Sequence, residues 1–307
     1  ADILDSTLAL KVMTRTEAKL LPYEAALYAS GALDDLPDGL VAPRWHGTID
    51  LGMGRTGIWL DLERDAPDIA WDVERFGLAA RHLGRLAGTI HPALLEQARK
   101  RPLRSFWSDA AYVEATFRAF ANEPDNDLAR RAWPDPVKRA LLKFWSQRGS
   151  VLERVETLPV MPCHGDAQRR NFFAQRDVTV AIDWANFSMA PVGMDMATLV
   201  HYALAYFDLD IADAMELERC VLEGYTLGMA DVGTSLDRDT VWFGFTAQLV
   251  FLGLLETGVV LRLAGDPTSH DRAVAFYNQP VDAILDRRRV IADFLLHVGS
   301  RMAQDRS

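Results

Sequence analysis

Apolar and polar positions divide the chain into a strand-rich beginning and a longer helical remainder. Residues 8–13 form an apolar run, and shorter runs at 47–51 and 57–62 flank a glycine-rich turn. Runs of this length beside glycine are typical of strands. Residues 17–30 follow helical spacing and end at a glycine, so we predict a helix between the first strand and the hairpin.

From Asp72 onward the spacing of apolar residues becomes helical. Asp72 can cap a helix over residues 73–90, whose apolar side chains recur on one face. A strand, a loop and a hairpin interrupt this pattern over residues 160–184. Further helices are predicted over residues 109–121, 136–158, 210–229, 240–263 and 270–297.

These elements predict an α+β fold of two lobes. A small antiparallel sheet occupies the N-terminal lobe, residues 1–62, and a larger, mainly helical lobe covers residues 63–307. The chain has 307 residues, of which 49% are hydrophobic and 25% charged, a composition that excludes a disordered protein. Its formal net charge of −10 argues against a general nucleic-acid binder or a binder of anionic membranes, and it is compatible with a cationic ligand.

Cysteine usage and hydropathy predict a cytoplasmic protein. Cys163 and Cys220 have neither the spacing of a zinc site nor that of a disulfide framework. The most apolar stretch, residues 246–263, contains Glu256 and Arg262, which favours a buried helix over a membrane span. We therefore expect neither a membrane nor a nucleic acid as a partner.

Three oxygen-bearing side chains are predicted to meet at the interrupting segment. Asp166 and Asn171 lie five positions apart on a polar loop that follows an apolar strand. Alternation of apolar residues over 178–182 places Asp183 at the end of the next strand, beside that loop. Such oxygens suit Mg²⁺, which takes one or two carboxylates together with substrate phosphates. A further carboxylate can accept a proton from a hydroxyl, so the set is suited to phosphoryl transfer.

The loop resembles a known family. A protein-kinase loop has His-Arg-Asp with an Asn five positions after the Asp, and then a metal-binding Asp on the next hairpin. Here the loop reads His164-Gly165-Asp166 before Asn171, and Ile182-Asp183-Trp184 and Gly193-Met194-Asp195 follow. This pattern is similar to that of the aminoglycoside phosphotransferase and choline kinase-like family. The resemblance implies a bilobal protein kinase-like fold.

The resemblance also implies a role for each matching residue. It makes Asp166 the catalytic base and makes Asn171 and Asp183 the magnesium ligands. It makes His164 and Asp195 residues that brace the loop without reacting. Read by itself, Asp166 could instead form an Asx turn, and His164 could be a buried histidine bonded to loop carbonyls. A metallohydrolase interpretation lacks a cluster of further histidines.

Lys11 is the candidate contact to the nucleotide phosphates. It is one of five lysines in an arginine-rich chain, and it lies within an apolar strand. In kinase-like folds such a lysine contacts the ATP phosphates and pairs with a glutamate of the following helix. Glu24 is the best candidate partner, with Glu17 as the alternative. A solvent-facing lysine at a strand edge is the competing interpretation.

The sequence departs from the family pattern before and within the loop. Residues 52–57 read G-x-G-x-x-G, but they join strand to strand and follow Lys11, so we interpret them as a hairpin turn. Only ten residues precede Lys11, and we expect the phosphate-covering glycine-rich hairpin to be missing from the N-terminal lobe. Gln168 and Arg170 replace residues common in the family. Arg170 contacts phosphate in one interpretation and solvent in the other.

The helical lobe and residues 102–133 are expected to build the pocket for the phosphoryl acceptor. Acidic side chains there would suit an aminoglycoside, and aromatic ones a quaternary ammonium, although the former could form a solvated helix face and the latter the core. The acidic candidates are Asp208, Asp210, Asp213, Glu216 and Glu218, and the aromatic candidates are Trp107, Trp145, Trp242, Phe243 and Tyr277.

Together these features predict an enzyme that uses Mg²⁺ and ATP, or GTP, to phosphorylate a hydroxyl group of a small molecule. The alternative is a kinase-like protein that binds a nucleotide or another ligand and does not catalyse. A protein kinase is disfavoured, because Gly165 stands where protein kinases have arginine and no Ala-Pro-Glu follows Asp183.

Overall fold

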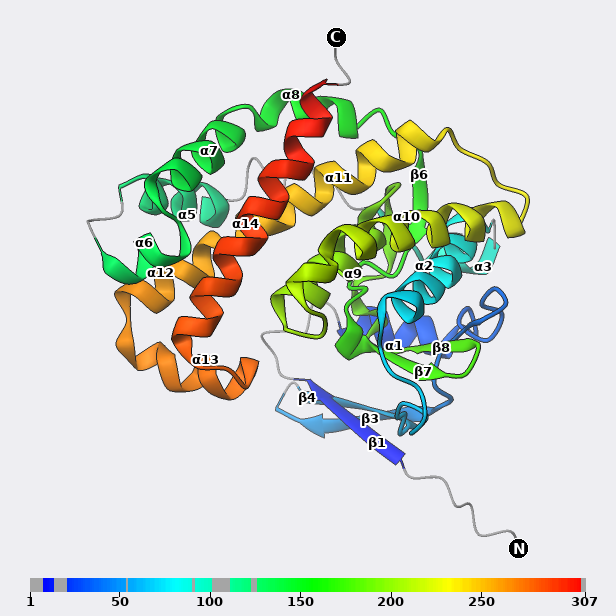
Figure 1. Ribbon diagram of the computed structural model, residues 1–307. Coiled ribbons are helices and arrows are strands. Elements are labelled where there is room, and N and C mark those ends of the chain that lie inside the picture. The colour runs from blue at the N-terminus through cyan, green and yellow to red at the C-terminus, as the bar shows by residue number, and fades with distance from the viewer. Residues whose placement is uncertain are drawn as a thin grey trace, which may run out of the picture.

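The computed structural model describes residues 8–13, 21–53, 55–89, 92–100, 111–122 and 126–304. Near the N-terminus, an antiparallel sheet has the strand order β1-β4-β3, and Figure 1 shows it apart from most of the helices. Its elements are β1 (Leu8–Met13), α1 (Leu21–Ala29), β3 (Trp45–Gly52) and β4 (Arg55–Asp61). The glycine-rich segment turns the chain from β3 into β4, as predicted. Residues 17–20 of the predicted helix lie outside the described residues.

Two further small sheets hold the predicted strand–loop–hairpin segment. Their strand orders are β2-β8-β7 and β5-β9-β6. The strands are β2 (Leu40–Val41), β5 (Arg99–Lys100), β6 (Val160–Cys163), β7 (Phe172–Gln175), β8 (Val178–Ala181) and β9 (Ser188–Pro191). The sequence analysis predicted β6, β7 and β8. It missed β2 and β5, which have two residues each and are too short for a periodic signal, and β9, whose sequence Ser-Met-Ala-Pro has no β-branched or aromatic residue.

Helices make up most of the remaining structure, and in Figure 1 most of them lie above the β7–β8 hairpin. They are α2 (Val73–Gly88), α3 (Pro92–Gln97), α5 (Ala111–Ala121), α6 (Asp127–Ala132), α7 (Asp135–Ser146), α8 (Arg148–Val155), α9 (Met194–Ala205), α10 (Ala214–Asp231), α11 (Arg238–Leu255), α12 (Thr257–Gly265), α13 (His270–Tyr277) and α14 (Val281–Gln304). Short 3₁₀ turns are η1 (Arg169–Asn171), η2 (Trp184–Asn186), η3 (Ile211–Asp213) and η4 (Pro267–Ser269).

Three helices predicted as continuous are each broken in two, which corrects the sequence prediction. The break between α7 and α8 is at Gln147, two residues before a glycine. The break between α11 and α12 is at Glu256, whose carboxylate is drawn inward by Arg288. The break between α13 and α14 is at Asn278, which is left-handed (φ 51°) and precedes Pro280. Proline cannot continue a helix, so this last break had a local signal.

Two hydrophobic cores support the structure. The first joins the N-terminal sheet to α2, the hairpin, α9 and α10, with Phe76 and Trp184 fully buried. The second lies among α5–α8, α11, α12 and α14. Helices α2 and α10 approach so closely that a Cβ on Gly84 would lie 2.1 Å from a backbone oxygen of α10. This close packing makes a rigid base beneath the hairpin.

Helices α11 and α12 form the one stretch of the described chain that is long and apolar enough to cross a membrane. Of its most apolar window, 72% is buried inside the protein. Such burial is typical of a core helix. Together the small sheet and the mainly helical remainder form a bilobal α+β fold, as predicted.

Candidate active site

The loop after β6 is held in place by one buried carboxylate. Asp195, in the first turn of α9, is 2% exposed. Its two oxygens accept hydrogen bonds from the backbone N–H groups of His164 (2.8 Å) and Gly165 (2.9 Å). A loop backbone has no ladder partners of its own, so these bonds fix its path. The structure therefore puts Asp195 in the bracing position that the sequence predicted.

His164 and Gly165 are both confined by their surroundings. The His164 ring is fully buried, pairs with the Ile182 carbonyl (Nε2 to O, 2.9 Å) and meets the rings of Phe172 and Trp184 edge-on. Gly165 has a φ of +79°, and a Cβ there would lie 2.2 Å from a backbone oxygen. Only glycine fits this position. His164 therefore links the loop to the strand end that leads to Asp183.

Two side-chain amides orient the Asp166 carboxylate. Nδ2 of Asn171 donates to the backbone oxygen and to Oδ2 of Asp166, both at 3.0 Å. Nε2 of Gln168 donates to Oδ1 at 3.0 Å. Asp166 is half-buried, so its carboxylate is oriented while part of the residue still faces solvent. Because the Asn171 nitrogen points at Asp166, the amide oxygen Oδ1 of Asn171 is the atom that can ligate a cation.

Lys11 lies between two carboxylates, as the sequence predicted for Glu24. Its Nζ is 2.7 Å from Glu24 Oε2 and 2.6 Å from Asp183 Oδ1. Burial opposes the charged form of Lys11, but the two carboxylates outweigh burial and hold the pKa of Lys11 above its usual value. The ammonium has three donor hydrogens, so one remains for a further partner. The alternative partner Glu17 lies outside the described residues.

Glu24 connects the first helix to the hairpin. It is fully buried, and its Oε1 accepts a hydrogen bond from the Trp184 N–H at 3.1 Å. Burial raises the pKa of the Glu24 carboxyl, and Lys11 offsets part of that rise. Asp183, the neighbour of Trp184, is left-handed (φ 61°, ψ 57°), which turns its side chain out of the strand toward Lys11. One carboxylate thus sets the position of both the lysine and the strand end.

The candidate metal ligands suit a hard cation that takes some of its ligands from the protein and the others from phosphate oxygens and water. Asn171 and Asp183 are tied together through the backbone, since the Ile182 N–H donates to the Asn171 carbonyl at 2.9 Å. In the part of the chain that the structure describes, no three His, Cys, Asp or Glu residues are grouped as metal ligands. One amide oxygen and one carboxylate are too few for a closed protein site. They fit Mg²⁺, which takes its other ligands from phosphates and water.

Asp65 is a site-supporting residue that the sequence analysis missed. Its Oδ1 accepts from the Ala174 N–H (2.7 Å) and from the Trp71 indole (2.9 Å), and its Oδ2 pairs with Arg169. Trp71 also lies under the Arg169 guanidinium, 4.9 Å from the ring centre to the carbon. Asp65 directly precedes Ala66-Pro67, a pair that indicates only a break in regular structure, and its backbone partner Ala174 is 109 positions away. No local pattern could have revealed it.

Comparison with known proteins identifies the family to which the chain belongs. Its sequence matches the model of the phosphotransferase enzyme family (APH) over residues 4–226, more than half of its length. The chain belongs to this family. No protein with a curated description matches it. The resemblance drawn from the loop motif is thereby confirmed.

Solved structures of similar fold include an amicoumacin kinase in complex with AMP-PNP and Ca²⁺, with 14% identity over 96% of this chain and 84% of that one (TM-score 0.57). An aminoglycoside phosphotransferase from Alicyclobacillus acidocaldarius has 15% identity over 99% and 89% (TM-score 0.56). A choline/ethanolamine kinase family protein from Mesorhizobium loti has 15% identity over 92% and 86% (TM-score 0.52). These similarities confirm the kinase-like fold.

In this phosphotransferase, most of the acidic residues that were predicted to bind the phosphoryl acceptor contact other groups of the protein. Asp210 caps η3, Glu216 pairs with Arg219, and Glu218 pairs with Arg301. Burial raises the pKa of Asp208, with a partly opposing effect from the two arginines of the catalytic loop. Trp145 and Phe243 belong to the second core, and Trp107 lies outside the described residues. The acidic cluster is therefore mostly structural.

Arg170 makes contacts that neither predicted alternative included. It is exposed, but its guanidinium lies over the rings of Tyr206 (4.3 Å) and Phe276 (4.4 Å) and donates to the Phe276 carbonyl at 3.3 Å. Cation–π contacts of this kind are worth about 0.5–1 kcal/mol when exposed. Arg170 therefore joins the catalytic loop to α13.

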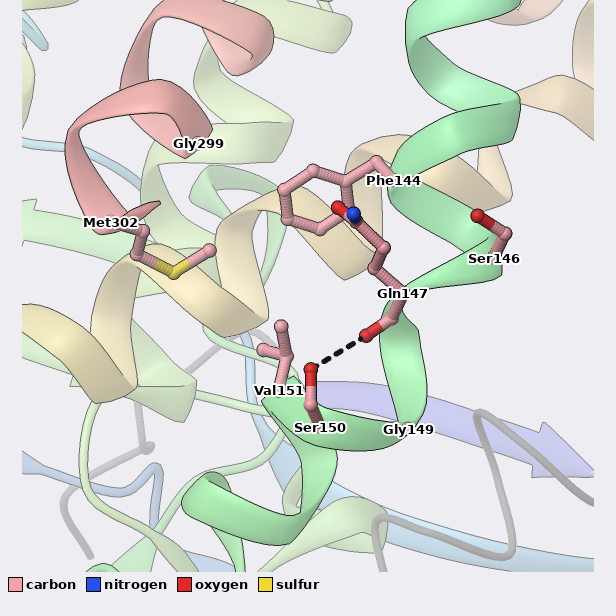
Figure 2. A pocket seen from close by; sticks show the side chains of 8 residues that line it. All are labelled: Phe144, Ser146, Gln147, Gly149, Ser150, Val151, Gly299 and Met302. Atoms are coloured by element: carbon pink, nitrogen blue, oxygen red, sulfur yellow. Dashed lines mark hydrogen bonds between the residues drawn. The ribbon is translucent and has the colours of Figure 1, made fainter. Parts of the chain in front are cut away.

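A pocket of about 420 Å³ lies away from these residues, between the α7–α8 corner and the end of α14. Figure 2 shows Phe144, Val151 and Met302 around it, and a hydrogen bond from the Ser150 hydroxyl to the Gln147 carbonyl (3.1 Å) at its rim. It shares no residue with the catalytic loop. A second pocket, of about 210 Å³, lies between α12 and α13 and includes Phe276.

Proposed function

We propose that this phosphotransferase moves the γ-phosphoryl group of ATP or GTP to a hydroxyl group of a small molecule, in the presence of Mg²⁺. The observation that carries the proposal is that one backbone hydrogen bond, from Ile182 to Asn171, connects the surroundings of Asp166 to those of Lys11. Asp166 is held by Asn171, and Asn171 is bonded to the residue before Asp183, which pairs with Lys11. A proton acceptor, a pair of metal ligands and a phosphate-binding cation thus share one site.

Each residue has a defined part in this reaction. Lys11 binds the nucleotide phosphates through its remaining donor, and Glu24 holds it in position. Asn171 and Asp183 would hold Mg²⁺, which when bound neutralises phosphate charge. Asp166 aligns the acceptor hydroxyl and takes its proton. The hydroxyl oxygen forms the new bond to the γ-phosphorus, the bond from that phosphorus to the bridging oxygen breaks, and the nucleoside diphosphate leaves.

The names of similar structures support a nucleotide and a small acceptor. They include the amicoumacin kinase bound to AMP-PNP and a spectinomycin phosphotransferase bound to AMP, the latter with 12% identity and a TM-score of 0.55. The raised pKa of Lys11 also supports the proposal, because it keeps the ammonium charged at neutral pH. We place the reaction in the cytoplasm, where ATP and Mg²⁺ are both present.

The test compares Asp166→Ala with Asp177→Ala, a matched change at an exposed position on the same hairpin. Nucleoside diphosphate release is measured with a set of hydroxylated acceptors, and nucleotide binding is measured by thermal shift with and without Mg²⁺. We expect Asp166→Ala to lose about 10²–10⁴-fold in turnover and to retain Mg²⁺-dependent binding. Asp177→Ala should behave like the unmodified protein.

Full turnover in Asp166→Ala would overturn the assignment of the base. The competing function, a binding protein that does not catalyse, has a different signature. Nucleotide would then stabilise the unmodified protein to the same extent with and without Mg²⁺, and no acceptor would be phosphorylated.

A further inference from the structure

The pocket between α12 and α13 combines an apolar interior with a cationic rim. Its volume is about 210 Å³. Leu263 is buried at its base, the rings of Phe276 and Tyr277 form a wall, and Arg262 and Arg272 stand exposed at its edge. In Figure 1, α13 lies at the lower edge of the helical lobe, on the side of the N-terminal sheet. A flat apolar group fits such a wall of rings.

The two arginines differ from the others discussed for the helical lobe because they are unpaired. Over the described ranges, neither Arg262 nor Arg272 has a side-chain hydrogen bond or an ion pair, whereas Arg301 pairs with a buried glutamate. The nearby Asp266 carboxylate is bonded to Thr268, whose N–H and hydroxyl donate to Asp266 Oδ1 at 3.0 and 2.6 Å. Two guanidinium groups are therefore free to bind a ligand.

The described lining of the pocket contains no carboxylate. Two lining residues carry a hydroxyl, Ser269 and Tyr277, and that of Ser269 donates to the Asp266 carbonyl at 2.7 Å. An ammonium group in this pocket would meet two positive charges, and the Asp266 carboxylate, which interacts electrostatically with Arg272, lies outside the described lining. A carboxylate or phosphate would instead find guanidinium forks that can bind it through two parallel hydrogen bonds.

The pocket is connected to the catalytic loop and its wall is held firmly. Arg170, four positions after Asp166, packs on Phe276 and donates to its carbonyl. Behind the wall, the Arg288 guanidinium lies 5.0 Å from the Tyr277 ring centre and 2.6 Å from the Glu256 carboxylate. Phe276 therefore lines the pocket and also contacts the loop that presents Asp166.

We propose that the acceptor is an anionic alcohol: a hydroxylated small molecule with a flat apolar body and a carboxylate or phosphate group that Arg262 and Arg272 bind. This inference rests on the proposed function and specifies its acceptor. It replaces the cationic acceptor that the acidic composition suggested. The acid group is held at the rim, the flat body packs against the rings of Phe276 and Tyr277, which stand perpendicular to each other, and the hydroxyl points toward Asp166.

The first experiment uses acceptors that share one hydroxymethylphenyl body and differ in the charge of the group opposite the hydroxymethyl. The set is 4-(hydroxymethyl)benzoate, 4-(hydroxymethyl)phenyl phosphate, 4-(hydroxymethyl)benzamide and 4-(hydroxymethyl)benzylamine, each given with ATP and Mg²⁺. We expect kcat/KM for an anionic member to exceed that for the amide by about ten- to a hundredfold, as for a charge-assisted hydrogen bond, and the amine to be poorest. Comparing the benzoate with the phosphate identifies which anion is preferred.

The second experiment changes the rim. Arg262→Gln and Arg272→Gln should each raise KM for the anionic acceptor about tenfold or more, and Arg272→Glu should shift the preference toward the amine. Arg139→Gln, an exposed arginine of α7, is the matched control and should change nothing. Thermal unfolding of every variant shows that it is folded.

The outcomes separate this inference from the proposed function. The anionic acceptor is overturned if the amine or amide is used as well as the anions or better, or if substitution of neither arginine changes the acceptor KM. Either result leaves the proposed phosphotransferase function unaffected. Mg²⁺-dependent nucleotide binding without phosphorylation of either anion also counts against the inference. Absence of both Mg²⁺-dependent nucleotide binding and phosphoryl transfer overturns the proposed function itself.

Discussion

Buried carboxylates support two regions of the molecule, the loop and strand end that carry Asp166 and Asp183 and the packed C-terminal helices, and they act differently in each. Around the loop and strand end, Asp195 of α9 and Glu24 of α1 accept hydrogen bonds from backbone N–H groups. In the helical lobe, Glu256 and Glu218 pair with arginines of α14. In the first region the carboxylate determines the path of the chain, and in the second it determines how helices sit against each other.

The difference follows from what the backbone lacks in each region. Where helix packs on helix, the neighbouring backbone groups are already bonded within their own helices, so a buried acid there pairs with a side chain. An irregular loop has unpaired N–H groups, and a carboxylate supplies the missing acceptors. Removing the two kinds of carboxylate should therefore have opposite consequences for stability and activity.

The largest loss of stability is expected from Glu256→Gln. Arg288 is 1% exposed and would be left as a buried charge without its partner, which typically costs about 3–5 kcal/mol. The free energy of unfolding is measured by urea titration. Asp293→Asn, an exposed position on α14, is the control. A loss below about 1 kcal/mol would show that the helical lobe does not depend on this pair.

Asp195→Asn should cost less stability and more activity. His164 and Gly165 each donate to a different oxygen of Asp195, and in asparagine one of these becomes an NH₂ group that cannot accept, so one buried N–H loses its partner at about 1–3 kcal/mol. Phosphoryl transfer should fall by more than the folded fraction does, because the loop that carries Asp166 loses its support. Turnover and unfolding are measured on the same samples, with Asp177→Asn as the control. Normal turnover in a folded Asp195→Asn would remove the distinction between the two regions.

These regions also differ in how far the sequence could predict them. Asp166, Asn171 and Asp183 could be placed because a short loop and an alternating strand set their spacing locally. The predicted contact between Lys11 and Glu24 is observed at 2.7 Å. The break at Glu256 could not be predicted, because the apolar pattern continues through it and the deciding partner lies on another helix.

Arg170 and Asp65 show the same limit within the site. Arg170 was recognised as a loop residue and Asp65 was not singled out, and the partners of both come from distant parts of the chain: Phe276 is 106 positions from Arg170, and Ala174 is 109 from Asp65. Charge and spacing gave no reason to join them. What the sequence predicted was the reactive loop, and what it missed was the set of long-range contacts that hold the loop.

The smallest expected effect is a pH dependence at the back of the hairpin. His82 pairs with the Thr179 hydroxyl at 2.9 Å, and burial, with help from nearby arginines, lowers the pKa of His82 to about 3. Below pH 6.5 the His82 imidazole therefore binds a proton in the unfolded chain but stays neutral in the folded chain until the pH approaches 3. Stability from this group is present above pH 6.5 and falls as the pH drops toward 3, by up to about 1.4 kcal/mol per pH unit.

Urea unfolding at pH 7, 6 and 5 measures this slope. His82→Gln cannot take up the proton, so its stability should fall less steeply than that of the unmodified protein over the same range. Equal slopes would mean that His82 titrates normally in the folded protein, and that the hairpin does not depend on a neutral histidine.

The pairing of Lys11 with Asp183 bears on how the protein is made. These residues are 172 positions apart, and synthesis proceeds from the N-terminus. Lys11 therefore leaves the ribosome long before Asp183 has been synthesised. Before that point, Glu24 is the carboxylate of this site with which Lys11 can pair. The nucleotide end of the site is completed only after β8 has emerged. A nascent chain that stops before that strand folds without a finished site, whatever the state of its first sheet.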